Sequence, residues 1–507
     1  MIRRLVIPWL LGVAVLGAAE SSDLLRFTNG DQLHGTFEGI KDGPKAVWLR
    51  DDVATPVEYK ADQVRQIVLR GGRPVKSLAS VSHVALVNGD RIPGKIVEMD
   101  DRSVTMDTEF AGMLRIPRDQ VAMFAPNPLG GRLRYHGPFI EDEWKMAHAA
   151  FPEGMPAEEK EAAGNETVKP EQPGRWAFSG SGWYWKSKSY GTAIIRENAM
   201  PDRAILRFDL AWRNRLSVAI AFHADLAKPQ PEEKNEANHD DPRRRPLGFV
   251  PGDSAILPKL FGNSYVLQIF SMQMILYRTS VDGDGVPSVE RVQINGGGTR
   301  LGDTGKATVE IRSNRLTGEI SLFMDGAFVA QWNESAGGLY DPSRFAGKGN
   351  AFGFVVQTED SPVKVSDVMV AEWNGMPDSA RSLQADDQDI VLLTNGTDRF
   401  SGKVESFRDG KIRFDGKFGQ FQFSLGDVAE IRFARNTLAK ESEAPADNLV
   451  VQLSPLGQIS GRPVSGTASS VHLVNPVCGE IDVALEAAVL LDFHGSNNFI
   501  DDWDAEF

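Results

Sequence analysis

Three consecutive aromatic side chains, Trp183, Tyr184 and Trp185, combine residue types that bind sugars with the spacing of a strand. The face of an aromatic ring buries the apolar face of a pyranose, so such side chains stack on carbohydrates. In a strand the two tryptophans share one face and the tyrosine takes the other. The sequence leaves two alternatives open: these rings line a sugar-binding site, or they pack into a core.

Three further residues carry ligand chemistry. His223 follows a strand-like run and either lines the same site or sits in a turn. Asp282 and Asp284 have the carboxylate spacing of a calcium loop, although the later Asn or Asp and the distal Glu of a complete loop are missing. They therefore predict either a structural calcium ion or a plain hairpin tip.

Catalytic motifs are absent from the sequence. It contains no Gly-x-Ser-x-Gly nucleophile elbow, phosphate loop or paired-histidine zinc pattern. Cleavage of a glycosidic bond needs two carboxyl groups in one pocket, and Asp209, Glu310 and Asp325 are the strand-associated acids that could supply them. The sequence leans towards binding without catalysis.

A short β-motif occurs four times and brackets the region that holds these residues. The clearest copies run from Val87 to Gly94 and from Leu393 to Gly402, and the other two keep Gly35 and Gly461. Asn-Gly steps and alternating apolar residues predict about five short strands in each copy. Because so small a unit buries little surface alone, we expect copies one and two to pack together, and copies three and four likewise.

The region between the repeats is rich in alternating runs with aromatic residues, which predicts a β-sandwich. Two stretches, Asp142 to Ala150 and Ala157 to Ala163, are the fair candidates for helix. Pro152 to Gly174 and Lys228 to Arg245 are polar, contain almost no large apolar residues, and are expected to be loops or insertions.

The order of motifs in this central region resembles a known family. The relevant segments are Gly182-Trp183-Tyr184-Trp185, Tyr190-Gly191, Glu310 to Gly318, and Met324-Asp325-Gly326. They are similar to a concanavalin A-like (laminin G-like) jelly roll, of the bacterial exported class that includes 3-keto-disaccharide hydrolases. The repeats resemble SH3-like or Sm-like small barrels. The first resemblance implies the fold but not the activity, because jelly rolls include lectins, hydrolases and adhesion modules.

The N-terminus has the pattern of a secretory signal: Arg3 and Arg4, an apolar run from Leu5 to Leu16, and small residues before Glu20. We therefore expect export to the periplasm, the cell surface or the medium, with no transmembrane span after signal cleavage. The only cysteine is Cys478, so no intramolecular disulfide forms. A net charge of −14 argues against binding to nucleic acid.

These observations predict an all-β modular protein with a signal peptide at 1–19, small barrels at 20–73, 80–127, 386–436 and 446–495, and a jelly-roll sandwich at 131–378. The preferred hypothesis is a secreted, non-catalytic protein that binds a glycan or cell-surface polymer through its sandwich and that the repeats fix in place or assemble into a homo-oligomer. The alternatives are an exported glycoside hydrolase and a structural envelope scaffold. A flat sandwich without a pocket but with a large exposed apolar patch would favour the scaffold.

Overall fold

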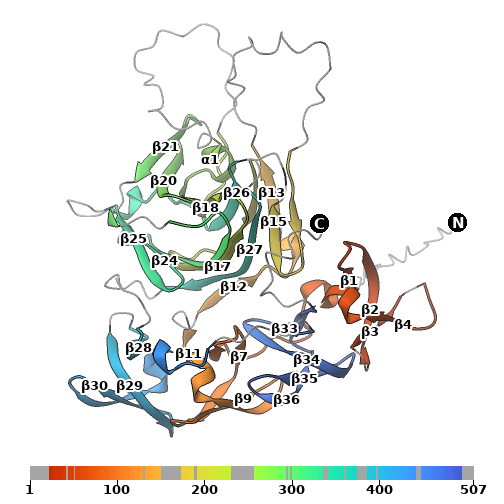
Figure 1. Cartoon of the computed structure of the whole chain (residues 1–507). Coiled ribbons are helices and arrows are strands. Elements are labelled where there is room, and N and C mark those ends of the chain that lie inside the picture. The colour runs from red at the N-terminus through yellow and green to blue at the C-terminus, as the bar shows by residue number, and fades with distance from the viewer. Residues whose placement is uncertain are drawn as a thin grey trace, which may run out of the picture.

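The computed structural model describes residues 22–41, 44–50, 52–128, 132–149, 173–185, 187, 191–229, 256–292, 295–296, 300–334, 341–358, 361–373, 385–395, 398–440 and 447–493. Nearly all regular structure in these residues is β-strand, which confirms the all-β class. Figure 1 shows a sandwich formed by the central region, standing on a platform built by the N-terminal and C-terminal segments. The predicted signal segment lies outside the described residues.

The platform consists of four units that share one order of strands. Unit 1 contains β1 (Asp23–Phe27), β2 (Gln32–Lys41), β3 (Lys45–Leu49), β4 (Val57–Lys60) and β5 (Val64–Val68). Unit 2 contains β6 (His83–Leu86), β7 (Arg91–Pro93), β8 (Lys95–Met99), β9 (Ser103–Thr108), β10 (Gly112–Pro117) and β11 (Val121–Ala125), where β7 and β8 are two halves of the second strand. Unit 3 contains β28 (Asp389–Leu393), β29 (Arg399–Arg408), β30 (Lys411–Gly416), β31 (Gly419–Ser424) and β32 (Val428–Arg432). Unit 4 contains β33 (Leu449–Leu453), β34 (Gly457–Thr467), β35 (Ser470–Asn475), β36 (Gly479–Ala484) and β37 (Ala488–Asp492).

The glycine that recurs in the motif marks the place where the second strand passes close to the third. A Cβ at Gly35 would lie 2.4 Å from the carbonyl oxygen of Leu49, and a Cβ at Gly402 would lie 2.3 Å from that of Asp415. No side chain fits at such distances from backbone, so the repeat requires glycine at this point. The motif seen in the sequence therefore has a steric cause.

The units pair in a nested order, which corrects the expected pairing of neighbours in sequence. Unit 1 pairs with unit 4 through β2 with β34 and β5 with β37. Unit 2 pairs with unit 3 in the equivalent way, through β8 with β29 and β11 with β32. Each pair thus joins second strand to second strand and fifth strand to fifth strand. This arrangement brings the two ends of the sandwich region close together on one platform.

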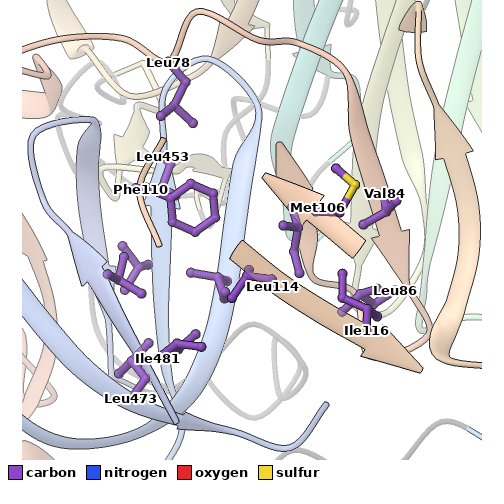
Figure 2. Close-up of a cluster of buried hydrophobic side chains, with 14 of the residues drawn as sticks. Leu78, Val84, Leu86, Met106, Phe110, Leu114, Ile116, Leu453, Leu473 and Ile481 are labelled. Carbon is purple, nitrogen blue, oxygen red and sulfur yellow. The ribbon is translucent and has the colours of Figure 1, made fainter. Parts of the chain in front are cut away.

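Units 2 and 4 connect the two pairs through a shared core. Gln458 of β34 lies opposite Arg91 of β7, and the Ala484 amide donates to the carbonyl oxygen of Phe110 at 2.8 Å. In Figure 2, Phe110 and Leu114 of unit 2 lie among side chains of unit 4 that include Leu453. Unit 4 therefore packs against both unit 1 and unit 2, and the four units form one body.

The sandwich has two antiparallel sheets. The nine-stranded sheet has the order β14 (Trp176–Phe178), β15 (Gly182–Trp185), β27 (Val363–Glu372), β17 (Arg203–Trp212), β23 (Gly305–Asn314), β24 (Glu319–Met324), β25 (Ala327–Asn333) and β22 (Asn295–Gly296), and β12 (Leu133–Gly137) also pairs with β27. The seven-stranded sheet has the order β13 (Trp144–His148), β16 (Thr192–Arg196), β26 (Ala351–Val356), β18 (Ser217–Ala224), β19 (Ser264–Phe270), β20 (Met274–Val281) and β21 (Pro287–Val292). This architecture agrees with the predicted jelly-roll sandwich.

The main core of the sandwich lies between the two sheets, because alternate residues of each strand point inward. Leu206 and Phe208 of β17 meet Ile220 and Phe222 of β18 there, all fully buried. A second apolar layer covers the outer face of the seven-stranded sheet, where the short helix α1 (Leu257–Phe261) packs on small side chains.

The expected helix from Asp142 to Ala150 is wrong. Residues Trp144–His148 form β13, which pairs with β16, and a single 3₁₀ turn precedes it. Trp144 is buried against the inter-sheet core, and this tertiary contact outweighs the local helical preference. The second helical candidate, Ala157 to Ala163, lies outside the described residues. Within the described part of the chain, no helix combines the length and apolar character needed to span a membrane.

A buried ion network fastens the sandwich to the platform. Both terminal nitrogens of Arg91 in unit 2 donate to the Asp367 carboxylate of β27, at 3.1 and 2.9 Å. Nε2 of His136 on β12 lies 2.8 Å from the same carboxylate. At a second contact, Arg26 of unit 1 donates to the carbonyl oxygen of Phe178 at 2.7 Å. Arg73 of the platform also contacts Asp142, in the turn before β13, at 3.0 Å. The sandwich is therefore held at several places.

Candidate ligand-binding cleft

A cleft of about 1080 Å³ opens at one end of the sandwich. The strand registers explain its position: Arg203 lies opposite Asn314, Ala204 opposite Glu372, and Ala224 opposite Ala351. The ends of five strands and the start of β12 thus meet at the same edge of the two sheets. The charged residues of the lining are Arg132, Arg134, Arg203, Arg315, Lys348, Glu197, Asp202, Asp225 and Glu372.

Two arginines at the start of β12 share one carboxylate at the end of β27. Arg132 directly precedes β12 and Arg134 is its second residue; the two are called the arginine pair of β12. Arg132 contacts one oxygen of Glu372 at 3.0 Å, and Arg134 contacts the other. Hydrogen bonds from both arginines, with Arg134 the larger cause, hold the pKa of Glu372 below its usual range. This carboxyl is therefore ionised at neutral pH and is no general acid.

The hairpin between β23 and β24 forms another part of the lining. Arg315 contacts Asp202 at 3.1 Å and donates to the carbonyl oxygen of Gly349. A Cβ at Gly349 would lie 1.8 Å from the carbonyl oxygen of Ala224, so the backbone approaches here too closely for any side chain. These contacts fix three separate loops of the cleft relative to one another.

Hydrogen bonds to backbone hold Asp225 in place. One carboxylate oxygen accepts the amide N–H groups of Ala227 and Asn263, each at 2.9 Å, and the other accepts the Asn263 side chain at 2.7 Å. Asp225 therefore shapes the loop after β18.

Three residues of this region that are not glycine adopt left-handed backbone angles. The φ values are +57° at Asn198, +54° at His223 and +59° at Leu226. Each costs conformational free energy and persists where the surrounding structure enforces it, as is common at functional sites. Tertiary contacts thus hold the backbone of these loops in the conformation that lines the cleft.

The structure places Trp183, Tyr184 and Trp185 in β15, where all three side chains are buried. Trp183 and Trp185 belong to the core between the sheets, where Trp176 packs against Trp185 and Phe178 against Trp183. Tyr184 lies on the other face, beside Lys364. The alternation expected of a strand is present, but these rings do not line the cleft. Of the two alternatives, the described structure shows packing.

His223 lies in β18, immediately before two residues that line the cleft. Its side chain is fully buried, and Nε2 lies 2.8 Å from the Ser313 hydroxyl. Burial lowers the pKa of His223 well below its usual value, and nearby Arg315 adds to this shift. Its carbonyl oxygen accepts the Gly349 amide at 3.0 Å. His223 therefore supports the wall of the cleft through its backbone.

Asp282 and Asp284 form the turn between β20 and β21. One oxygen of Asp282 accepts the backbone amides of Asp284 at 3.0 Å and of Val286 at 2.8 Å. Among the described residues, no three His, Cys, Asp or Glu side chains group in a way that could hold a metal ion. The hairpin alternative thus accounts for Asp282, and a calcium ion at this turn stays a prediction.

The three acids considered for glycoside cleavage do not line the cleft. Asp209 accepts the Thr308 hydroxyl at 2.7 Å, and Glu310 contacts Arg312 at 2.8 Å. Asp325 caps the β24–β25 turn by accepting the Thr308 amide at 2.8 Å. A hydrolase that relied on these residues is not supported, because each serves a local structural contact.

Sequence reasoning missed the arginines of the cleft. Arg315 stood inside a motif that was considered only for the fold, and Arg132 and Arg134 lie at the boundary between unit 2 and the sandwich. The alternating Arg-Leu-Arg pattern was a usable signal, since two cations on one face of a strand are seldom placed together without a partner.

Comparisons with known proteins found similarity to solved structures of low sequence identity. No protein-family model and no curated protein matched the sequence. A protein of unknown function with a galectin-like fold from Bacillus subtilis is 13% identical, with 48% of this chain and 96% of that chain covered and a TM-score of 0.28. The carbohydrate-binding module CBM66 from Bacillus subtilis is 12% identical, with 39% and 92% covered and a TM-score of 0.25. A Bacillus licheniformis β-glucanase is 7% identical, with 47% and 97% covered and a TM-score of 0.25. At these values the similarities carry no information on activity.

Proposed function

We propose that this chain is an exported protein that binds a glycan, without cleaving it, in the cleft at the end of its sandwich. The observation that carries the proposal is the cleft itself: about 1080 Å³ of space surrounded by guanidinium, carboxylate and amide side chains on fixed strand ends. This volume is slightly above the usual range for small-molecule sites, about 300–1,000 Å³.

The chemistry of the lining favours a polyhydroxylated ligand over an apolar one. Ligand pockets for apolar molecules are lined mainly by hydrophobic side chains. Here the lining contains many guanidinium, carboxylate and amide groups, which are planar and polar. A planar group with two donors or two acceptors matches two neighbouring hydroxyls of a sugar ring. Leu316, with 58% of its surface exposed at the cleft, offers an apolar contact for one ring face.

Binding is favoured over cleavage by the state of the carboxylates in the lining. Glycoside cleavage uses one carboxyl group whose pKa is raised so that it can donate a proton. Glu372 has a lowered pKa, Asp202 and Glu197 contact Arg315 and Lys145, and Asp225 accepts backbone amides. None of these four is set up as the acid of such a pair.

The platform supplies rigidity in this proposal. Because the sandwich is attached at several places, its cleft keeps one orientation relative to the four units. If the platform assembles into a homo-oligomer, several clefts would then face one polymer and avidity would raise the apparent affinity. Export and assembly are both parts of the proposal.

The test is calorimetric titration of the full mature chain with a panel of oligosaccharides and polysaccharides, with and without a calcium chelator. We expect at least one ligand to bind, and Asn350→Ala in the cleft to weaken it. Asn436→Ala in unit 3 is the matched control, since both asparagines are exposed. Trp183→Phe keeps an aromatic ring in the core and is expected to leave binding unchanged.

Two outcomes would overturn the proposal. Failure of the folded chain to bind any glycan in a broad panel would favour the scaffold hypothesis. Binding that Trp183→Phe weakens and Asn350→Ala does not would place the ligand elsewhere. Loss of binding in chelator would support the predicted calcium ion.

A further inference from the structure

The arginine pair of β12 distinguishes this cleft from a site for neutral sugars. Arg132 and Arg134 both contact Glu372 of the neighbouring strand. The exposed fractions of the two arginine side chains are 73% and 51%, whereas that of Glu372 is 25%. The Glu372 carboxylate is thus the more buried group, and the two guanidinium groups are the more exposed to solvent.

This arrangement leaves positive charge for a ligand. One carboxylate carries one negative charge, while the two arginines carry two positive charges at any pH the protein meets. Each arginine contacts Glu372 through one terminal nitrogen, Nη1 of Arg132 and Nη2 of Arg134. The planar fork of each group therefore keeps donors for a second acceptor.

A further cation of the lining has a neutral partner. Lys348 donates to the carbonyl oxygen of Ser343 and lies in the same lining as the arginine pair. The nine charged residues of the lining include one more cation than anion, in a chain whose net charge is −14. The lining of the cleft therefore carries a net positive charge, although the chain as a whole is strongly negative.

We infer that the glycan bound in the cleft is anionic, and that Arg132 and Arg134 anchor its acidic groups. This inference rests on the proposed function and names its ligand class. The acidic group is a carboxylate, as in a uronic acid, or a sulfate ester, because both present two or three oxygens to the guanidinium fork. A neutral sugar would leave the excess charge of the pair uncompensated by the ligand.

The experiment uses the full mature chain and polymers that differ only in charge. Binding is measured by calorimetry for dextran against dextran sulfate, and for fully methyl-esterified polygalacturonate against its free-acid form. We expect the charged member of at least one pair to bind about tenfold more tightly, or more, than its neutral counterpart. The pair that responds identifies sulfate or carboxylate as the recognised group.

Variants test whether the preference for the charged polymer arises in the cleft. Arg132→Gln/Arg134→Gln is expected to weaken binding of the charged polymer by about tenfold or more, since charge-assisted hydrogen bonds are lost. Lys348→Gln, which does not touch the β12–β27 contact, is expected to weaken it less. Arg408→Gln removes an arginine of similar exposure, 68%, from unit 3 and is expected to have no effect. Thermal unfolding confirms that each variant is folded.

The outcomes separate this inference from the proposed function. Equal binding of the charged and neutral members, with Asn350→Ala still harmful, would overturn the anionic class and keep the glycan site. An equal loss in Arg408→Gln and in the double variant would show attraction by overall charge and would also overturn the inference. Absence of binding to every polymer in both panels would remove the proposed function itself.

Discussion

Strands β12 and β27 each contribute to two networks of arginine and carboxylate. The carboxylates are similarly exposed, 27% for Asp367 and 25% for Glu372, so the networks differ in the burial of their cations. At one, Asp367 of β27 accepts Arg91 from the platform and lies against His136 of β12. At the other, Glu372 of β27 contacts Arg132 and Arg134 of β12 at the rim of the cleft. The side chain of His136 is 1% exposed and that of Arg91 13%, against 73% for Arg132.

The comparison shows that the same chemistry serves two purposes according to its contact with water. In the buried network each charge depends on its partner, because water cannot replace a lost contact. In the exposed network water and ions screen the charges, so the contact adds little stability and the donors stay available. Burial of its cations thus suits the first network to holding the sandwich on the platform, and exposure leaves the second available for the proposed ligand.

The largest expected effect comes from removing one charge of the buried network. Asp367→Asn keeps the size of the side chain and tolerates the positive φ of +46° at this position. It leaves the Arg91 guanidinium without its carboxylate, and we expect a loss of about 3 kcal/mol in the free energy of unfolding, the lower end of the range for such changes. Urea denaturation of the mature chain measures it.

A double variant tests the cause of that loss. Arg91→Met/Asp367→Asn removes both charges, and it should recover part of the stability, because the Arg91 guanidinium is no longer left without the Asp367 carboxylate. If the double variant is as unstable as the sum of the single variants, charge pairing is not the reason for the loss.

The second effect is a pH dependence of the free energy of unfolding. It comes from His83, a buried histidine near Arg91 of the buried network. Burial and the neighbouring Arg91 lower the pKa of His83 to about 4. The folded chain binds this proton more weakly than the unfolded chain, whose histidine titrates near 6.5. The contribution of neutral His83 to stability is therefore complete above pH 6.5 and is lost as the pH falls towards 4. At about 1.4 kcal/mol per pKa unit, the total loss is about 3 kcal/mol.

The difference in unfolding free energy between the native chain and His83→Gln isolates this contribution. It should shrink as the pH is lowered from 6.5 to 4. Burial raises the pKa of Asp90 to about 6, and its contribution has the opposite sign, but it is present in both chains and cancels in the difference. A difference that is constant with pH would show that His83 is not shielded from water as the structure indicates.

The smallest expected effect on stability comes from the exposed network. Glu372→Gln should leave the urea midpoint unchanged within error, because solvent screens this contact. The same variant should strengthen binding of an anionic polymer, since it removes the one carboxylate that competes for Arg132 and Arg134. A clear loss of stability would show that both networks are structural, and the comparison would fail.

Several features could be predicted from the sequence because their causes are local. Alternation predicted the strands, and Gly35 and Gly402 marked the close passage of two strands in each unit. Trp183 and Trp185 were expected to share a face, and they do. Whether that face meets solvent or another sheet depends on the rest of the fold, so a sugar platform and a core could not be told apart.

The pairing of the units and the composition of the cleft could not be predicted. In all four units the second and fifth strands are the edges available for pairing with another unit. The local sequence pattern does not determine which two units pair. The stretch from Asp142 to Ala150, which was expected to be helical and contains β13, shows the same limit, because Trp144 has its partners in distant strands. The cleft draws Arg132, Arg315 and Lys348 from a stretch of more than 200 residues.

The sequence by itself determined the all-β class, the strands of each repeat and the glycines at which two strands pass closely, because these depend on side-chain alternation and on steric limits between near neighbours. The tertiary structure decided which units pair, that the tryptophans are core, and that cations from distant strand ends share one cleft. These outcomes depend on which surfaces lose water when remote segments meet, and burial of that kind is a property of the whole fold.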